Sequence, residues 1–295
     1  MIKQTLMFTT PVSLSMKNKQ LVIDRRDSDE VVTRPIEDIG FVVVANQMVK
    51  MTVPLLNALA ENNVSVIFCD GKQMPKSMLM TLEGNTTQQE SYRYQMEASE
   101  PIKKRAWKQI VESKVRNQAA LLDNVGQDGD ALKPYYMNVK SGDSDNREGA
   151  AARIYWSMLF GKTFKRDRDG EQPNAMLNYG YAILRAAMAR ALVGSGLYPA
   201  FGIFHRNRYN AFPLADDLME PYRPFVDEIV YHLYMDGAND ELTTEVKAHL
   251  LRVLFVDVRI GKMTRPLEVA LSMTTASLAK AFRDGETKLV LPAMP

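Results

Sequence analysis

The sequence has little cysteine, no long apolar run and almost no net charge. Cys69 is the only cysteine among 295 residues, so an internal disulfide and zinc sites built from several cysteines are excluded. Cys69 ends an apolar run, and we expect it to be a buried strand residue. No apolar run approaches the roughly 18 residues that a membrane-spanning helix needs, and residues 1–5 lack a signal-peptide core. We therefore expect a cytoplasmic protein with no membrane partner.

Nucleotide-binding and base-reading motifs are also missing. The chain has no Gly-x4-Gly-Lys-Ser/Thr loop and no Gly-x-Gly-x-x-Gly turn, and nothing in it is similar to a helix-turn-helix or zinc module. The net charge of +2 says nothing about nucleic acid. Its distribution is more informative, because basic residues gather in three clusters. A charge run is usually a solvated face, but three together favour phosphate binding. The candidate DNA contacts are Lys103, Lys104, Arg105, Lys108, Lys162, Lys165, Arg166, Arg206 and Arg208.

The composition and hydrophobic patterns predict an α+β protein with about two domains. Apolar content of 46% and charged content of 24% are typical of a globular chain with a sizeable core. We predict a small β-stranded N-terminal domain over 1–75, a linker over 76–88, a larger all-helical catalytic domain over 89–285 and a loosely ordered tail over 286–295. The expected strands are 5–10, 12–16, 20–24, 31–33, 39–44 and 64–69, and the expected helices include 52–61, 174–193 and 214–235, with 123–145 as a polar connection.

Three widely separated polar residues stand in unusual settings. Glu148 begins a helix face that is otherwise apolar, and His205 directly follows the apolar run 201–204. Glu220 ends an acidic cluster with Asp216 and Asp217, whose spacing places all three carboxylates on one helix face. Two carboxylates and one imidazole, if they converge, would suit Mg²⁺ or Mn²⁺.

Each of these residues also has an ordinary structural interpretation. Asp145 and Glu148 have the spacing of a capping box, in which the glutamate turns back to the cap residue. A lone histidine after an apolar run is more often a core or boundary residue than a ligand. Acidic residues near a helix start also complement the helix dipole. Local spacing alone does not decide between these interpretations and a metal site.

Four segments occur in order and at plausible spacing, namely residues 146–155, 177–184, 196–205 and 213–224. Together they resemble the CRISPR-associated integrase of spacer acquisition. Segments 36–39 and 64–70 are similar to the β-stranded domain of that family. The resemblance spans residues 1 to about 275, and the wording Asn-Arg-Glu-Gly at 146–149 is most similar to the type II subfamily.

The resemblance implies both an assembly and a set of site residues. It implies a homodimer that binds a small dimeric adaptation protein in a heterohexamer, together with double-stranded DNA as the incoming fragment and the CRISPR repeat. A type II accessory ring protein and the effector nuclease are further implied partners. Glu148, His205 and Glu220 match the family's catalytic metal ligands, and Asp217 is a candidate to hold the His205 ring from outside the ligand shell.

The implied reaction is a transesterification, in which a DNA 3′-hydroxyl attacks a phosphodiester of the repeat. This reaction needs no nucleotide hydrolysis, which agrees with the missing phosphate-binding loops. A structure-selective nuclease acting outside CRISPR would use the same ligands with water as the nucleophile, and a non-catalytic DNA-binding scaffold would use none of them. Because Asp217 is placed outside the ligand shell, Asp217→Asn is expected to be milder than replacement of a ligand.

Overall fold

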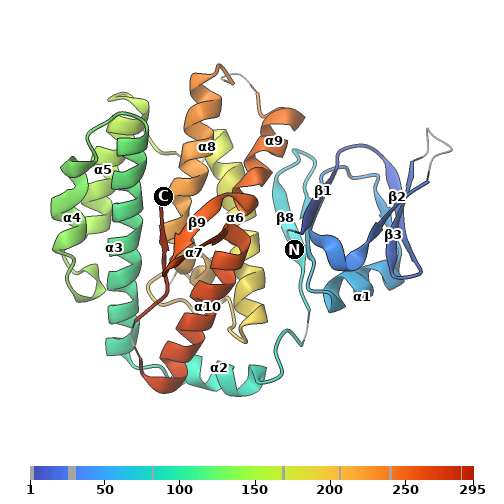
Figure 1. The fold of residues 1–295 in the computed structure, drawn as a ribbon, viewed down its shortest axis with the longest axis horizontal. Helices are drawn as coiled ribbons and strands as arrows, with labels where there is room; N and C mark the ends of the chain where they lie inside the picture. The colour runs from blue at the N-terminus through green and yellow to red at the C-terminus, as the bar shows by residue number, and fades with distance from the viewer. Residues whose placement is uncertain are drawn as a thin grey trace. The chain divides into compact units, whose positions relative to one another are not determined.

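The computed structural model describes residues 3–25, 31–81, 83–167, 170–205, 207–238, 241–286 and 288–295. The chain forms two compact units, Met1–Gly84 and Asn85–Pro295 (Figure 1). The first is rich in strands and the second is mostly helical, which confirms the predicted α+β class. The segment 76–88, predicted as a linker, is partly structured, because Pro75–Leu79 forms strand β8 of the first unit.

The described residues of the N-terminal unit form two four-stranded sheets and one α-helix. In one sheet β1, β5 and β7 run parallel and β8 is antiparallel to β7, in the order β1-β5-β7-β8. The other sheet has the order β4-β3-β2-β6. The bounds are β1 Gln4–Phe8, β2 Val12–Lys17, β3 Gln20–Arg25, β4 Val31–Pro35, β5 Ile39–Val44, β6 Lys50–Met51, α1 Val53–Glu61, β7 Ser65–Cys69 and β8 Pro75–Leu79, with a 3-10 turn at Ile36–Asp38.

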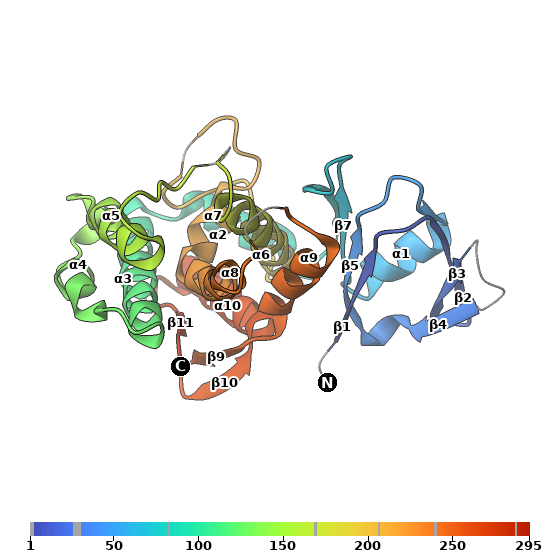
Figure 2. The ribbon, with the colours of Figure 1, turned by 90° about the horizontal axis from the view of Figure 1, so that it is seen from above.

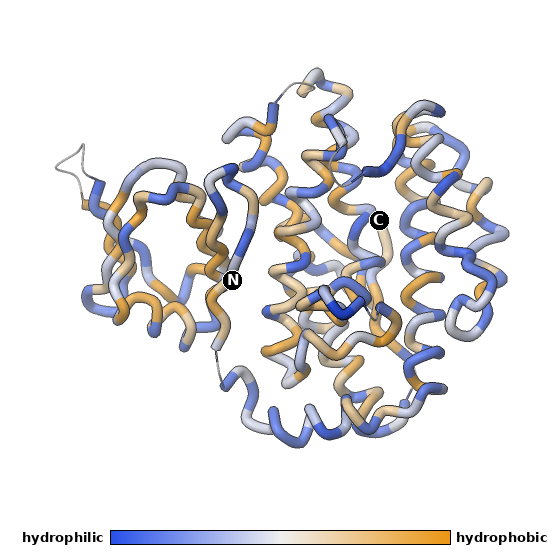
Figure 3. Tube along the Cα trace, turned by 180° about the vertical axis from the view of Figure 1, so that it is seen from behind, coloured by the Kyte–Doolittle hydropathy of each residue, from blue (hydrophilic) through white to orange (hydrophobic). Residues whose placement is uncertain are grey.

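Strand β5 lies at the centre of this unit because every one of its residues is apolar or glycine. All six residues of Ile39–Val44 are buried, as expected for a central parallel strand covered on both faces. In β2 the buried residues alternate, so Val12 and Leu14 enter the core while Ser13 and Ser15 do not. The hydrophobic positions along these strands are visible in Figure 3. Helix α1 begins after Thr52 and carries Pro54 in its first turn, as predicted.

The C-terminal unit is built around two long helices, α3 and α6, whose faces are lined by buried residues. Its helices are α2 Gln88–Glu97, α3 Glu100–Asn124, α4 Lys133–Met137, α5 Arg147–Phe160, α6 Asn174–Gly194, α7 Pro213–Met219, α8 Arg223–Met235, α9 Thr244–Leu251 and α10 Leu267–Asp284. Short 3-10 turns lie at Gly129–Leu132, Ser141–Asp143, Glu220–Tyr222 and Arg252–Phe255. Within the described parts of the chain, no helix is long and apolar enough to cross a membrane.

Three sequence predictions for this unit need correction. The polar connection over 123–145 contains α4 and two 3-10 turns, and several of its Gly and Asp residues lie within these 3-10 turns. The unit also holds a three-stranded sheet, visible in Figure 2, in the order β10-β9-β11, formed by β9 Asp257–Ile260, β10 Met263–Pro266 and β11 Pro292–Ala293.

The tail predicted as loosely ordered is bound to the rest of the C-terminal unit. Its strand β11 pairs with β9, and the Pro292 carbonyl accepts hydrogen bonds from Ser113 Oγ (3.0 Å) and Asn117 Nδ2 (3.2 Å) on α3. The Met294 amide donates to Asn117 Oδ1 at 3.1 Å. These polar partners lie far away in the sequence, so local composition could not reveal them.

Candidate active site

The side chain of Glu148 does not cap its own helix. The capping box with Asp145 does not form, because Asn146, in the left-handed conformation, caps α5 and accepts the Gly149 amide at 3.2 Å. The Asp143 carboxylate takes the amides of Arg147 (2.8 Å) and Glu148 (3.1 Å). The side chain of Glu148 is therefore free to point toward α3.

The partner of Glu148 on α3 is Lys114, which also reaches Glu220. The Lys114 Nζ atom lies 2.5 Å from Glu148 Oε1 and 2.5 Å from Glu220 Oε2. Burial by itself lowers the pKa of Lys114, but the two carboxylates outweigh it and the pKa is raised. One ammonium group thus joins two carboxylates whose residues are far apart in the sequence.

Glu220 has a second cationic neighbour, Arg223, one turn along the chain. The Arg223 Nε atom lies 3.0 Å from Glu220 Oε1, and its guanidinium carbon lies 4.5 Å from the centre of the Tyr181 ring. Burial tends to raise the pKa of Glu220, but Arg223 and Lys114 lower it overall. Glu220 Oε2 and Arg223 Nε are nevertheless without a hydrogen bond of good geometry. The contacts of Glu220 with Lys114 and with Arg223 are therefore ion pairs, since the charged atoms lie close together but the hydrogen-bond angles are poor.

His205 is held by the fully buried carboxylate of Asp217. The ring atom Nδ1 lies 2.5 Å from Asp217 Oδ1, and this contact raises the pKa of His205. The same carboxylate accepts the amides of Ile203 (2.6 Å), Phe204 (2.9 Å) and His205 (3.1 Å). Gly202 is required here, because a Cβ atom would lie only 2.7 Å from the His205 carbonyl oxygen and 3.1 Å from Asp217 Oδ2. Asp217 therefore fixes the whole turn that carries the imidazole.

The three carboxylates of the acidic cluster, Asp216, Asp217 and Glu220, do not lie on one helix face. Asp216 pairs with Arg185 (2.9 Å) and accepts a hydrogen bond from Asn210 (2.7 Å), whereas Asp217 faces His205 and Glu220 faces Lys114. The prediction that all three carboxylates share one helix face is therefore wrong. The helix ends at Met219 and a 3-10 turn begins at Glu220, so the three side chains leave the backbone in different directions.

Aromatic rings form a wall beside the imidazole. The buried Trp107 of α3 stacks on Phe204, with ring centres 4.3 Å apart and planes at 4°. Trp107 also meets the His205 ring edge-on at 5.7 Å. These contacts restrict the orientation of the His205 ring.

The donor set is suited to a hard divalent ion once Lys114 moves. Among the residues described, no three His, Cys, Asp or Glu side chains are already arranged around one point. However, the ammonium of Lys114 stands where a cation shared by Glu148 and Glu220 would be bound. Both carboxylates also act electrostatically on His205. Two carboxylates and one imidazole are ligands that Mg²⁺ or Mn²⁺ accepts.

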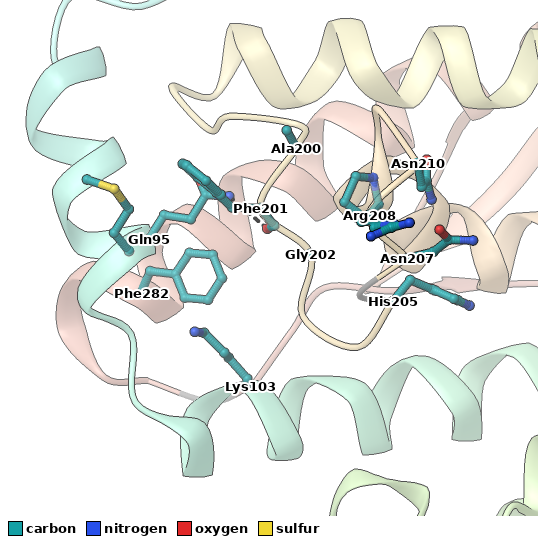
Figure 4. A pocket seen from close by; sticks show the side chains of 12 residues that line it. Gln95, Lys103, Ala200, Phe201, Gly202, His205, Asn207, Arg208, Asn210 and Phe282 are labelled. Carbon is teal, nitrogen blue, oxygen red and sulfur yellow. Dashed lines mark hydrogen bonds between the residues drawn. The ribbon is translucent and has the colours of Figure 1, made fainter.

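A cavity of about 440 Å³ opens beside His205, and its lining includes Lys103 and Arg208, one residue from each of two basic clusters. Figure 4 shows Lys103 from α3 together with His205 and Arg208 from the loop between α6 and α7. Arg208 lies over the ring of Tyr209 at 4.6 Å, and Lys103 makes only a loose ion pair with Glu100 at 3.8 Å. Both cations are therefore available to a bound phosphate.

The other basic candidates differ in availability. Lys104, Arg105, Lys162 and Lys165 are exposed, while Lys108 pairs with Glu112 at 3.6 Å. Arg166 is turned inward, since its guanidinium donates to Asn174 (3.0 Å) and Asn178 (2.7 Å). Arg166 is therefore a poor candidate for DNA contact, and Arg206 lies outside the described residues.

Sequence reasoning missed Lys114, although a signal was present. Buried residues of α3 recur at Trp107, Ile110, Val111 and Gln118, and Lys114 occupies a position of the same stripe. A lysine on an inward stripe needs a buried anion. Asn117 was missed as well, and its side chain joins the tail to the Pro221 carbonyl (2.8 Å), next to Glu220.

Comparison with known proteins identifies the family of the chain. The model of the family described as CRISPR associated protein Cas1 matches residues 6–254. A CRISPR-associated endonuclease Cas1 from Neisseria meningitidis serogroup C (strain 8013) is 38% identical over 283 residues, which cover 95% of this chain and 92% of that protein.

Two solved structures have the same fold at lower identity. A casposase bound to its integration product has a TM-score of 0.79 at 20% identity, covering 98% of this chain and 92% of that one. A chain of a Cas6-RT-Cas1–Cas2 complex has a TM-score of 0.73 at 19% identity, covering 97% of this chain and 35% of that one. The resemblance predicted from the four sequence segments is confirmed, and the chain belongs to the Cas1 family of CRISPR-associated proteins.

Proposed function

We propose that this protein is a divalent-metal-dependent DNA integrase and endonuclease that inserts DNA fragments into a CRISPR array. The observation that carries the proposal is the meeting of Glu148 and Glu220 at one cation, beside an imidazole held in place by Asp217. The family relatives are named endonucleases, and the casposase with the same fold was solved with an integration product. The sequence Asn-Arg-Glu-Gly at 146–149 further favours a type II system.

The metal would be held by Glu148, His205 and Glu220. When bound there, Mg²⁺ or Mn²⁺ would lower the pKa of the attacking 3′-hydroxyl and neutralise charge on the attacked phosphate. The protein's own side chains prepare the site. Asp217 occupies Nδ1 of His205, so the lone pair of Nε2 is the one left for coordination. Arg223 keeps Glu220 ionised in a buried position.

The substrate would be bound mainly through phosphates. Lys103 and Arg208 lie at the cavity beside His205, and the exposed cations Lys104 and Arg105 follow on the same helix as Lys103. Because phosphate contacts carry no base information, we expect recognition of DNA ends and shape. The proposed partners are a second copy of the chain and Cas2, which accompanies Cas1 in one structure of the same fold, in a heterohexamer. In a type II system the accessory ring protein and effector nuclease would join it.

A strand-transfer assay tests this function. A labelled duplex with 3′-hydroxyl ends is incubated with a supercoiled plasmid that carries a CRISPR repeat, with and without Cas2, in Mn²⁺ or Mg²⁺. We expect labelled plasmid with the wild-type protein, none in EDTA, and none with Glu148→Gln, His205→Ala or Glu220→Gln. Glu245→Gln, on the exposed side of α9, is the matched control and should retain activity.

The products distinguish integration from plain nuclease action. Transfer of the label to the plasmid requires a DNA hydroxyl as the nucleophile, whereas nicking without transfer requires water. Nicking alone, under every condition, would favour the nuclease acting outside CRISPR. Full strand transfer in EDTA, or by any of the three variants, would contradict the proposed metal site.

A further inference from the structure

Lys114 is the one cation among the described residues that contacts both Glu148 and Glu220. Its side chain is 10% exposed and comes from an otherwise apolar stripe of α3. Arg223, the other cation nearby, contacts Glu220 and stacks on Tyr181. Lys114 thus lies at the point that a shared metal ion would also occupy.

A lysine at this point has two opposite effects on a metal site. Without a metal ion, the two carboxylates would repel each other, and one of them is buried at 5% side-chain exposure. The ammonium removes that repulsion and keeps the carboxylates together. With a metal ion present, the same ammonium is a like charge within a few ångströms of a divalent cation, which opposes binding.

We propose that Lys114 is a built-in counter-ion that holds Glu148 and Glu220 together until a divalent cation displaces it, and that it thereby sets the metal affinity of the site. The inference rests on the proposed function, because it concerns the same metal ligands. Lys114 is a positioning residue here. It acts through the two carboxylates and touches no reacting atom.

The two cations beside Glu220 differ in their freedom to move. The guanidinium of Arg223 stacks on the Tyr181 ring, which restrains it, and it contacts Glu220 but not Glu148. Lys114 has a flexible four-carbon stem, and the Glu148 side chain that it contacts is 25% exposed, so this contact is partly open to solvent. Displacement of Lys114 therefore leaves Glu220 with Arg223 as a remaining partner and frees both carboxylates for a metal ion.

Calorimetric titration with Mn²⁺ tests the inference directly. We expect Lys114→Met to bind Mn²⁺ at least about tenfold more tightly than the wild-type protein, because the competing charge is gone. Lys133→Met is the matched control. It removes one positive charge from an exposed side chain of the same unit and should leave the Mn²⁺ affinity unchanged. A merely structural role for Lys114 would instead give weaker binding, because the carboxylates would separate.

Thermal unfolding provides a second measurement. In EDTA, Lys114→Met should unfold at a lower temperature than the wild-type protein, and Mn²⁺ should raise its unfolding temperature by a larger amount. If the methionine variant does not fold, Lys114→Gln takes its place, since glutamine can donate a hydrogen bond to either carboxylate without carrying a charge. Lys114→Arg keeps the charge and should bind Mn²⁺ no more tightly than the wild-type protein.

The outcomes separate this inference from the proposed function. Tighter binding by Lys114→Met or Lys114→Gln, abolished again when Glu220→Gln is added, supports the counter-ion. If the wild-type protein binds Mn²⁺ and the uncharged variants bind it equally well or more weakly, the counter-ion inference is wrong, but the metal site stands. Absence of Mn²⁺ binding in the wild-type protein and in all variants overturns both.

Discussion

Replacing Asp217 by asparagine removes one charge and one acceptor from the turn that carries His205. In the wild-type protein the carboxylate accepts three backbone amides, at 2.6, 2.9 and 3.1 Å, and contacts the imidazole at 2.5 Å. One oxygen serves Ile203 and Phe204, and the other serves the amide and ring of His205. Asparagine has a single acceptor oxygen, so its NH₂ group must face two of these four donors.

The structure gives the size of the effect. Hydrogen bonds to a charged acceptor contribute about 1.5–3 kcal/mol each, and a buried donor left unpaired is costly. Loss of two of them should lower the free energy of unfolding by about 3 kcal/mol or more. Gly202 and its neighbours are packed tightly around the carboxylate, which limits any rearrangement. We therefore expect Asp217→Asn to destabilise the protein severely, while its loss of strand transfer stays smaller than that of a ligand replacement, as predicted from sequence.

Three measurements test this expectation. The unfolding temperature should fall, strand transfer should decrease about 10–100-fold as for other residues that orient a metal-binding histidine, and saturation with Mn²⁺ should require a higher concentration. Asp216→Asn makes the same chemical change one residue away, where the partners are Arg185 and Asn210, and should lose much less activity. Wild-type stability and activity in Asp217→Asn would refute the idea that this carboxylate holds the turn.

Three further predictions concern other parts of the C-terminal unit. Burial raises the pKa of Asp227 to about 6 from 3.8, so the folded state binds this proton more tightly than the unfolded chain and loses stability as the pH rises from about 4 to 6. Asp227→Asn loses one acceptor for the hydroxyls of Tyr155 and Tyr181 at every pH, but its effect on the free energy of unfolding should be more favourable at pH 8 than at pH 4 by up to about 3 kcal/mol; equal effects in unfolding experiments at both pH values would contradict this. Deletion of 288–295, or Asn117→Leu, should lower the unfolding temperature and strand transfer together, since α3 loses its hydrogen bonds to β11; an unaffected deletion variant would show that the tail is dispensable. Lys103→Glu and Arg208→Glu should weaken DNA binding for all sequences and make the slope of log K against log salt shallower by about one unit each, and an unchanged slope would show that they are ordinary surface residues.

The sequence by itself determined most of the local structure and the family. Short β-branched and aromatic runs predicted six of the N-terminal strands to within a few residues, although β6 and β8 were missed. The 3.6-residue period predicted the helix that ends at Gly194. Both patterns depend on neighbours in the chain. The motif resemblance proposed Glu148, His205 and Glu220 as ligands. Their role as ligands stays a prediction.

The tertiary structure alone decided which groups share a site. Whether Glu148 caps its own helix or reaches Lys114 depends on Asp143 and Asn146, which take the capping contacts and leave its carboxylate free. Asn117 holds the tail through a hydrogen bond with Met294, and Lys114 forms an ion pair with Glu220. In both contacts the two residues lie more than a hundred positions apart in the sequence. Local patterns reflect interactions within about one helical turn, whereas a buried charge takes its partner from whatever the fold packs against it.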